Sequence, residues 1–308
     1  MKIKIISVIS LLVCALTASA QSEASDYLIG TFVEGNPLRL PLWPDGAPNS
    51  NGIDYATYQR HSDPLKAEAL KRTIEPDPEI FVYLPQGAEH PTKAVVACPG
   101  GGYACVVMHH EGLMWHDFFN QEGVALIVLG YRVPKHGHTE VPATDVYQAI
   151  RLVQAHAEEW NIDPAQIGVM GSSAGGHLAS TVATHAPDDV RPAFQILFYP
   201  VISMDAAITH AGSRQELLGD NPSDELVSLY SNELQVNSAT PRALILLSSD
   251  DDTVDPNNSI RYYQALLQAG VPASMHIYPT GGHGYGARTD FRYHTEMLVE
   301  ISKWLRTF

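Results

Sequence analysis

Positive charge is scarce in this 308-residue chain, which has 19 Lys and Arg against 34 Asp and Glu and a formal net charge of −15. A chain of this kind is poorly suited to hold phosphate backbones, because it would release few counterions on binding. The same balance disfavours attachment to an anionic membrane surface. The sequence therefore predicts a protein that acts on small or neutral substrates and binds neither nucleic acid nor membrane.

Long apolar runs are also rare, and the clearest one lies at the N-terminus. A short basic start precedes an apolar stretch over residues 5–16, which is shorter than the roughly 20 residues that span a bilayer. Small residues at 18–20 then match a signal-peptidase site. We expect residues 1–20 to be a signal peptide and residues 21–308 to form one domain of an exported protein, either periplasmic or secreted.

Cysteine is the third scarce feature, with three in the chain. Cys14 lies in the expected signal peptide, and Val13 stands before it where a lipidation site has a small residue, so we expect no lipid anchor. Cys98 and Cys105 could close a small loop in an oxidising compartment. We favour free buried thiols, because a bridge would strain a glycine-rich loop whose backbone is needed elsewhere. The few cysteines and the histidine spacing do not match a zinc site, so no metal is expected.

Short apolar runs alternate with helix-length amphipathic segments over most of the chain. The expected strands lie at 80–84, 94–98, 124–129, 167–170, 194–199, 243–247 and 274–278, and the expected helices at 112–121, 143–159, 174–185, 257–269 and 290–306. The strands are rich in Val, Ile and Leu without polar alternation, which is typical of a parallel sheet covered on both faces. This alternation predicts a doubly wound, three-layer α/β fold.

Two segments depart from the alternation. Residues 21–50 contain four prolines and little periodicity, so we expect an extended lead-in over the surface. Residues 201–241 contain short helix-like pieces around 214–218 and 224–230, and we expect an insertion over the carboxyl ends of the strands, where such sheets bind ligands. The sequence predicts one domain with one modest insertion.

A Gly-x-Ser-x-Gly motif at residues 171–175 joins the expected strand 167–170 to the expected helix 174–185. The motif alone is a weak signal. Between a strand and a helix, however, it is the setting in which a serine lies on a tight, strained turn with its oxygen exposed. The sequence predicts Ser173 as the nucleophile, with a glycine-rich turn without chemistry as the alternative.

A serine hydroxyl becomes a useful nucleophile when a base takes its proton. His283 lies in a glycine-rich loop after the last expected strand and is the predicted base. A third residue must accept a hydrogen bond from the imidazole, and the usual chain order is serine, acid, histidine. Asp250, Asp251 and Asp252 follow the expected strand 243–247; Asp251 is the first choice, and its two neighbours are the alternatives.

The reaction also needs donors for the oxyanion. Residues 99–103 read Pro-Gly-Gly-Gly-Tyr after the expected strand 94–98, so backbone N–H groups can approach a ligand there. We predict that Gly101, Gly102 and Ala174 supply the oxyanion hole, where each donor is typically worth about 3–4 kcal/mol. A phosphate-binding loop is disfavoured, because no helix with a basic residue follows in the required register.

Together these motifs resemble the α/β-hydrolase superfamily, and within it the exported bacterial esterases related to acetyl xylan esterases. The resemblance covers nearly all of residues 21–308. It rests on the segments 43–48, 99–103, 131–134, 171–179, 202–205, 230–233 and 281–286. The family's acid loop, as matched by residues 250–254, places the acid at Asp251. The chain departs from the family pattern at 247–249 and at Asp255, positions that do not carry the chemistry.

The resemblance implies a serine carboxylester hydrolase that needs no cofactor and removes acetyl groups from plant cell-wall polysaccharides such as xylan. Its substrate partner would be an acetylated polysaccharide or oligosaccharide. A feruloyl esterase or broad-specificity short-chain carboxylesterase is the enzymatic alternative, with a serine peptidase behind it. A non-catalytic carbohydrate-binding scaffold is disfavoured by the complete Ser-His-Asp set. An endo-xylanase is disfavoured as well, because it would need two carboxylates flanking a glycosidic bond, whereas the Ser-His-Asp set favours ester cleavage.

Overall fold

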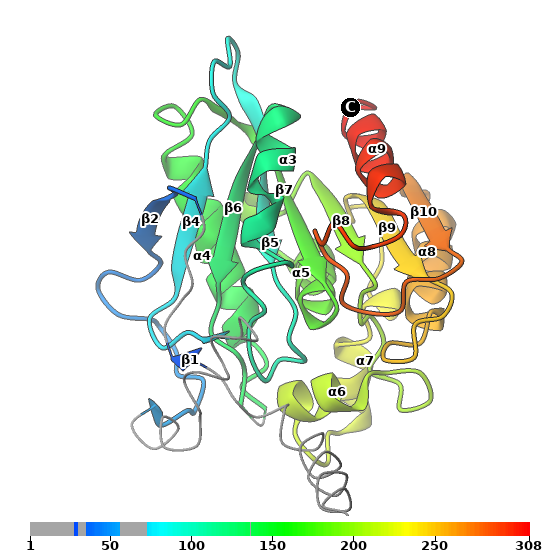
Figure 1. Ribbon diagram of the computed structural model, residues 1–308. Helices are drawn as coiled ribbons and strands as arrows, with labels where there is room; N and C mark the ends of the chain where they lie inside the picture. The colour runs from blue at the N-terminus through cyan, green and yellow to red at the C-terminus, as the bar shows by residue number, and fades with distance from the viewer. Residues whose placement is uncertain (1–27, 30–34, 56–72, 136) are drawn as a thin grey trace, which may run out of the picture.

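The computed structural model describes residues 28–29, 35–55, 73–135 and 137–308, and the expected signal peptide at 1–20 lies outside them. A central sheet with helices on both faces dominates this part of the chain (Figure 1). No helix in the described ranges has the length and apolar character that crossing a membrane requires.

The central sheet has eight strands in the order β10-β9-β8-β7-β5-β6-β4-β2. They are β2 (Leu38–Pro41), β4 (Glu79–Tyr83), β5 (Thr92–Cys98), β6 (Val124–Gly130), β7 (Ile162–Ser172), β8 (Phe194–Phe198), β9 (Arg242–Ser248) and β10 (Ala273–Tyr278). Neighbours from β6 to β10 are parallel, whereas β4 pairs antiparallel with β6 and β2. The expected mostly parallel sheet is confirmed. A separate parallel pair joins β1 (Leu28–Ile29) to β3 (Thr73–Ile74).

Helices cover both faces of the sheet, and two more lie in the insertion beyond the strand ends. The covering helices are α3 (His116–Gln121), α4 (Val141–Ala155), α5 (Ala174–His185), α8 (Asn257–Gln268) and α9 (His294–Leu305), and those of the insertion are α6 (Ala211–Leu218) and α7 (Asp224–Leu229). In Figure 1, α3 and α9 lie in front of the sheet and α4 lies behind it. Short 3₁₀ turns lie at Leu113–Trp115, Asp188–Val190 and Asn232–Leu234.

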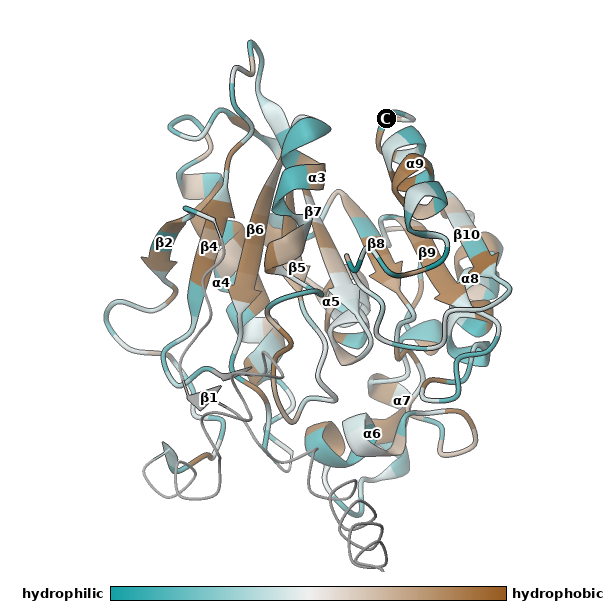
Figure 2. Ribbon diagram, in the orientation of Figure 1, coloured by the Kyte–Doolittle hydropathy of each residue, from teal (hydrophilic) through white to brown (hydrophobic). Residues whose placement is uncertain are grey.

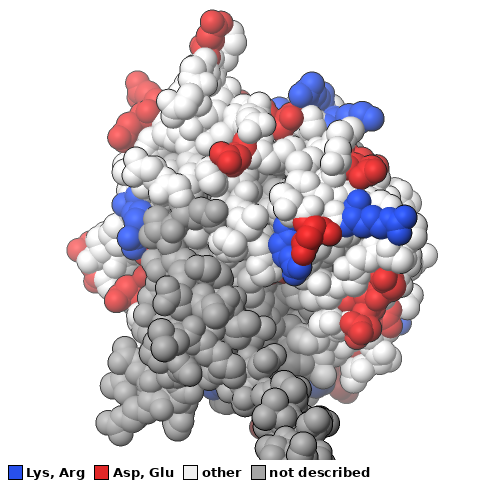
Figure 3. Space-filling view, viewed as in Figure 1, with Lys and Arg blue, Asp and Glu red and all other residues white. Residues whose placement is uncertain are grey.

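The apolar core lies between these layers. Every residue of β6 is buried, as are all five residues of β8, so these strands have no solvent-facing side. Figure 2 shows β6 as a hydrophobic band along its length, and β8 is hydrophobic apart from Gln195. Charged side chains of both signs are interspersed on the outer surface in Figure 3. Burial on both faces explains why the strands lack the polar alternation of an antiparallel sheet.

The insertion expected at 201–241 contains α6 and α7, and Figure 1 shows both beyond the arrowheads of β8 and β9. The expectation for the lead-in was incomplete. Its described residues include β2, which forms the edge of the sheet next to β4. Prolines within and around this four-residue strand interrupt the pattern by which a strand is recognised in a sequence. Proline is tolerated here because the strand lies at the edge of the sheet.

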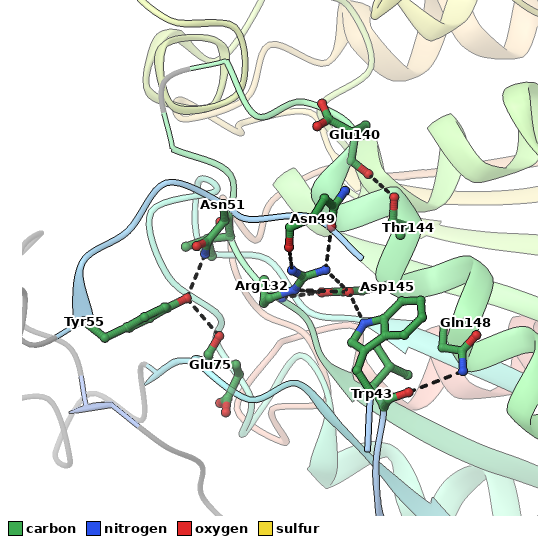
Figure 4. Close-up of polar contacts among 12 residues, drawn as sticks. Trp43, Asn49, Asn51, Tyr55, Glu75, Arg132, Glu140, Thr144, Asp145 and Gln148 are labelled. Carbon is green, nitrogen blue, oxygen red and sulfur yellow. Dashed lines mark hydrogen bonds and ion pairs between the residues drawn. The ribbon is translucent and has the colours of Figure 1, made fainter. Parts of the chain in front are cut away.

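A buried ion pair fastens the lead-in to the sheet. Arg132, just after β6, lies 2.6 Å from Asp145 of α4, and the two side chains are 4% and 0% exposed. Trp43 donates its indole N–H to the same carboxylate at 2.8 Å, and Arg132 donates to the carbonyl of Asn49 at 2.6 Å. Figure 4 shows the guanidinium between the carboxylate and the lead-in. This Arg132–Asp145 clamp gives the segments 43–48 and 131–134 a structural role.

Candidate active site

Ser173 is the single residue between the end of β7 and the start of α5. Its φ of 55° and ψ of −122° are costly for a residue with a side chain. Three backbone hydrogen bonds hold it there: its amide donates to Phe198, and its carbonyl accepts from His177 and Val201. The flanking Gly171 is required, because an added Cβ would lie 2.0 Å from the Gly175 carbonyl oxygen. The strand–turn–helix setting expected for the motif is present.

The structure brings Ser173, His283 and Asp251 into one hydrogen-bonded line. His283 Nε2 lies 2.8 Å from Ser173 Oγ, and His283 Nδ1 lies 2.7 Å from Asp251 Oδ2. The other oxygen of Asp251 accepts the amides of Thr253 and Val254 at 3.0 and 2.9 Å. Asp251 is 8% exposed, so its carboxylate is fixed by these bonds within the protein.

The neighbouring acids have different contacts. Asp250 accepts the backbone amide of Gly282 at 2.8 Å, which ties the acid loop to the histidine loop. Asp252 is exposed and accepts the hydroxyl of Thr253 at 3.3 Å. Asp251 is thus the member of the acidic run that contacts His283.

The loop at residues 99–102 lies against the serine turn, and a Cβ added at Gly100 would lie 2.9 Å from Ser173 Cβ. The Gly100 amide already donates to Glu111 at 2.7 Å. Within the described hydrogen-bond network, the amides of Gly101 and Gly102 have no protein acceptor. Ala174 is the first residue of α5, where an N–H has no partner inside the helix. Ala174 thus adjoins Ser173, and the loop that carries Gly101 and Gly102 contacts the serine turn at Gly100; their joint role as an oxyanion hole stays a prediction.

Glu111 and Tyr199 were missed by the sequence analysis. Glu111 is 4% exposed, and its second carboxylate oxygen accepts the hydroxyl of Tyr199 at 2.9 Å. That hydroxyl in turn accepts the amide of Gly286 at 2.8 Å, and the Tyr199 ring packs edge-on against His283 at 4.6 Å. Glu111 and Tyr199 lie 88 residues apart in the chain, so no local pattern indicates their pairing.

A pocket of 390 Å³ opens beside the 99–102 loop and is lined in part by Gly101 and Gly102. Its lining also includes Ala104, Cys105 and Val107, which follow this loop, and His210, Gln215 and Glu216 from the insertion. Cys105 and Cys98 form no disulfide with each other and both are buried, as favoured from the sequence. Among the described residues, no group of three or more His, Cys, Asp and Glu side chains is arranged to hold a metal ion.

Comparison with known proteins gives close relatives. An acetylxylan esterase from Xylanibacter ruminicola is 42% identical over 234 residues, which cover 74% of this chain and 48% of that protein. Endo-1,4-beta-xylanase B from Butyrivibrio fibrisolvens is 34% identical over 231 residues, which cover 69% of this chain and 35% of that protein. The chain thus spans half or less of the length of these two relatives.

A solved structure covers more of the chain. The acetyl ester-xyloside bifunctional hydrolase from Caldicellulosiruptor lactoaceticus is 34% identical, with a TM-score of 0.73, and the match covers 90% of this chain and 98% of that one. The BD-FAE family model matches residues 80–266, which include Ser173 and Asp251. The resemblance to α/β-hydrolase esterases related to acetyl xylan esterases is confirmed, and the chain belongs to the BD-FAE family.

Proposed function

We propose that the protein is a serine carboxylester hydrolase that removes acetyl groups from xylan-type plant cell-wall polysaccharides. The observation that carries this proposal is the continuous line from Ser173 through His283 to Asp251, with distances of 2.8 and 2.7 Å. Both are within the range expected of a nucleophile, its base and the group that orients the base. The 42% identity to an acetylxylan esterase supports acetyl as the acyl group and xylan as the polysaccharide.

The geometry leads to an acyl-enzyme mechanism. Asp251 accepts the Nδ1–H of His283, so Nε2 is the basic nitrogen that faces Ser173 Oγ. As Oγ attacks the ester carbonyl, Nε2 takes its proton and then delivers it to the departing sugar hydroxyl. Water, activated by the same nitrogen, hydrolyses the acetyl-serine to acetate and restores Ser173.

The negative charge that forms on the carbonyl oxygen needs fixed donors. The amides of Gly101, Gly102 and Ala174 would supply them, and preorganised donors of this kind stabilise the transition state without rearrangement. Ala174 also stands at the N-terminus of α5, where the helix dipole favours negative charge.

We expect p-nitrophenyl acetate to be preferred over the butyrate ester, and the octanoate ester to be hydrolysed very slowly. An apolar acyl slot gains about 0.8 kcal/mol for each buried CH₂. Here, however, the insertion beside the site presents His210, Gln215 and Glu216 to the pocket, and these would lose water to a longer chain. The measurement is kcat/KM across the chain-length series, together with acetate and ferulate release from acetylated and feruloylated xylan.

Preference for octanoate with no acetate release from acetylated xylan would contradict the proposal and indicate a general carboxylesterase. Ferulate release in excess of acetate release would favour the feruloyl esterase alternative instead.

A further inference from the structure

The pocket beside the 99–102 loop has more room than an acetyl group requires. Its 390 Å³ lies within the roughly 300–1,000 Å³ that is usual for small-molecule sites. An added Cβ at Gly102 would lie 3.7 Å from His210 Cε1, so the 99–102 loop and the insertion meet at one side of the pocket. The pocket shares Gly101 and Gly102 with the predicted oxyanion hole, so it is placed to take the larger part of a substrate whose carbonyl those amides bind.

Two segments of different chemistry line the pocket. Ala104, Cys105 and Val107 form its apolar wall. The insertion forms its polar wall, where His210 Nδ1 accepts the amide of Ser213 at 3.2 Å, so the neutral ring carries its proton on Nε2. Burial lowers the pKa of His210, and the nearby His283 lowers it further against an opposing effect of Asp251, which favours the neutral form of this ring.

The remaining polar residues are held in place by neighbours. Gln215 donates to Asp220 at 2.9 Å and retains a carbonyl oxygen as an acceptor. Glu216 pairs with Lys135 at 3.3 Å. An acyl chain in the pocket would desolvate this ion pair without compensation. A sugar ring, with apolar C–H faces and hydroxyl edges, matches both walls.

We propose that this pocket binds the sugar residue that carries the ester, a neutral pentose or hexose of an acetylated polysaccharide. The apolar wall packs on a C–H face of the ring, and His210 and Gln215 hydrogen-bond its hydroxyls. This inference rests on the proposed function.

The test replaces Gln215 with leucine, which keeps the size of the side chain and removes its hydrogen-bonding groups. We measure kcat/KM for acetylated xylo-oligosaccharides and for p-nitrophenyl acetate, whose leaving group has no hydroxyls. The kcat/KM for the oligosaccharides divided by that for p-nitrophenyl acetate should fall roughly 3- to 10-fold, as expected for one lost hydrogen bond. The matched control, Gln264→Leu, lies on an exposed part of α8 and should leave the ratio unchanged.

The outcomes separate the two proposals. Wild-type protein that hydrolyses p-nitrophenyl acetate but releases no acetate from the oligosaccharides overturns the proposed function and this subsite together. Wild-type acetate release with an unchanged ratio in Gln215→Leu overturns the subsite alone. A rise in the butyrate-to-acetate preference of Gln215→Leu, without loss on the oligosaccharides, also overturns it and indicates an acyl pocket.

A second inference comes from Glu111, a buried carboxylate that the mechanism above does not use. It fixes the amide of Gly100, directly before the predicted oxyanion donors. Through Tyr199 it also fixes Gly286, three residues after His283, and the Tyr199 ring contacts the imidazole itself. Burial, with the Glu111 charge, holds the pKa of Tyr199 well above its usual value, so its hydroxyl remains a donor to the carboxylate.

We infer that Glu111 and Tyr199 are positioning residues that set the oxyanion amides and the His283 ring together. An error of about 1 Å in such groups can cost roughly 10²-fold in rate. The effect belongs to the transition state, because the donors and the base act there rather than in substrate binding.

Tyr199→Phe keeps the ring against His283 and removes the link between the two loops, and Glu111→Gln weakens the same link from its other end. Both should lower kcat for p-nitrophenyl acetate roughly 10- to 100-fold, with KM changed by less than about two-fold. The control is Tyr262→Phe, which removes an equally buried hydroxyl that donates to Gln195 of β8 at 3.0 Å. Tyr262→Phe should lower the melting temperature, but its kcat should stay within about two-fold of the wild-type value.

Equal losses of kcat in Tyr199→Phe and Tyr262→Phe would show a general packing effect and overturn the inference. A rise in KM at constant kcat would overturn it as well. If Glu111→Gln does not fold, Tyr199→Phe decides the question by itself.

Discussion

Replacing Ser173 with alanine is expected to lower kcat for p-nitrophenyl acetate by roughly 10⁴- to 10⁶-fold and to leave the fold intact. The hydroxyl oxygen is the proposed nucleophile, and the turn itself is held by backbone bonds to Phe198, His177 and Val201 that alanine retains. The measurement is steady-state kcat, with circular dichroism and melting temperature as checks on the fold.

Covalent labelling gives an independent readout of the same residue. A fluorophosphonate should add its mass to the wild-type protein and to Ser172→Ala, and fail to add it to Ser173→Ala. Near-normal activity in Ser173→Ala would contradict the assignment and direct attention to the adjacent Ser172.

Asp251→Asn is expected to lower kcat by roughly 10⁴-fold. The amide oxygen can still accept the backbone N–H groups of Thr253 and Val254, so the acid loop keeps its shape. The amide nitrogen would then donate to His283 Nδ1, which places the imidazole proton on Nε2, facing Ser173. In that tautomer the ring cannot take the serine proton.

The neighbouring acids provide matched controls for this result. Asp250→Asn retains an oxygen for the Gly282 amide, and Asp252 is exposed, so both changes should cost far less than Asp251→Asn. A larger loss of kcat in either control would contradict the choice of Asp251 within the acidic run.

Local patterns predicted most of the fold. The expected helix 174–185 coincides with α5, and the expected strand 124–129 is within one residue of β6. Both are specified by nearby residues: continuous apolar burial for the strand, and a glycine turn before the helix. β2 could not be predicted in this way, because it depends on pairing with β4, which lies about 40 residues further along the chain.

The same distinction applies to the site. Ser173 and His283 lie in glycine-rich turns that the sequence displays directly, and the structure places them 2.8 Å apart. Asp251 could be chosen over the two neighbouring aspartates only from its position within the acid loop. Glu111 could not be predicted, since its partners Gly100 and Tyr199 come from different loops and only the folded sheet brings them together.

The Arg132–Asp145 clamp also has a consequence for the order in which the chain folds. Trp43 and Asp145 are 102 residues apart, and Asn49 and Arg132 are 83 apart, so these contacts close long loops. The lead-in is synthesised early but can dock only after β6 and α4 exist. Until then β2 is held only by its own pairing with β4, and whenever that pairing opens, β4 presents unpaired N–H and C=O groups to any other strand. By holding the lead-in beside the sheet, the clamp is expected to favour the pairing of β2 with β4 over intermolecular strand pairing and aggregation.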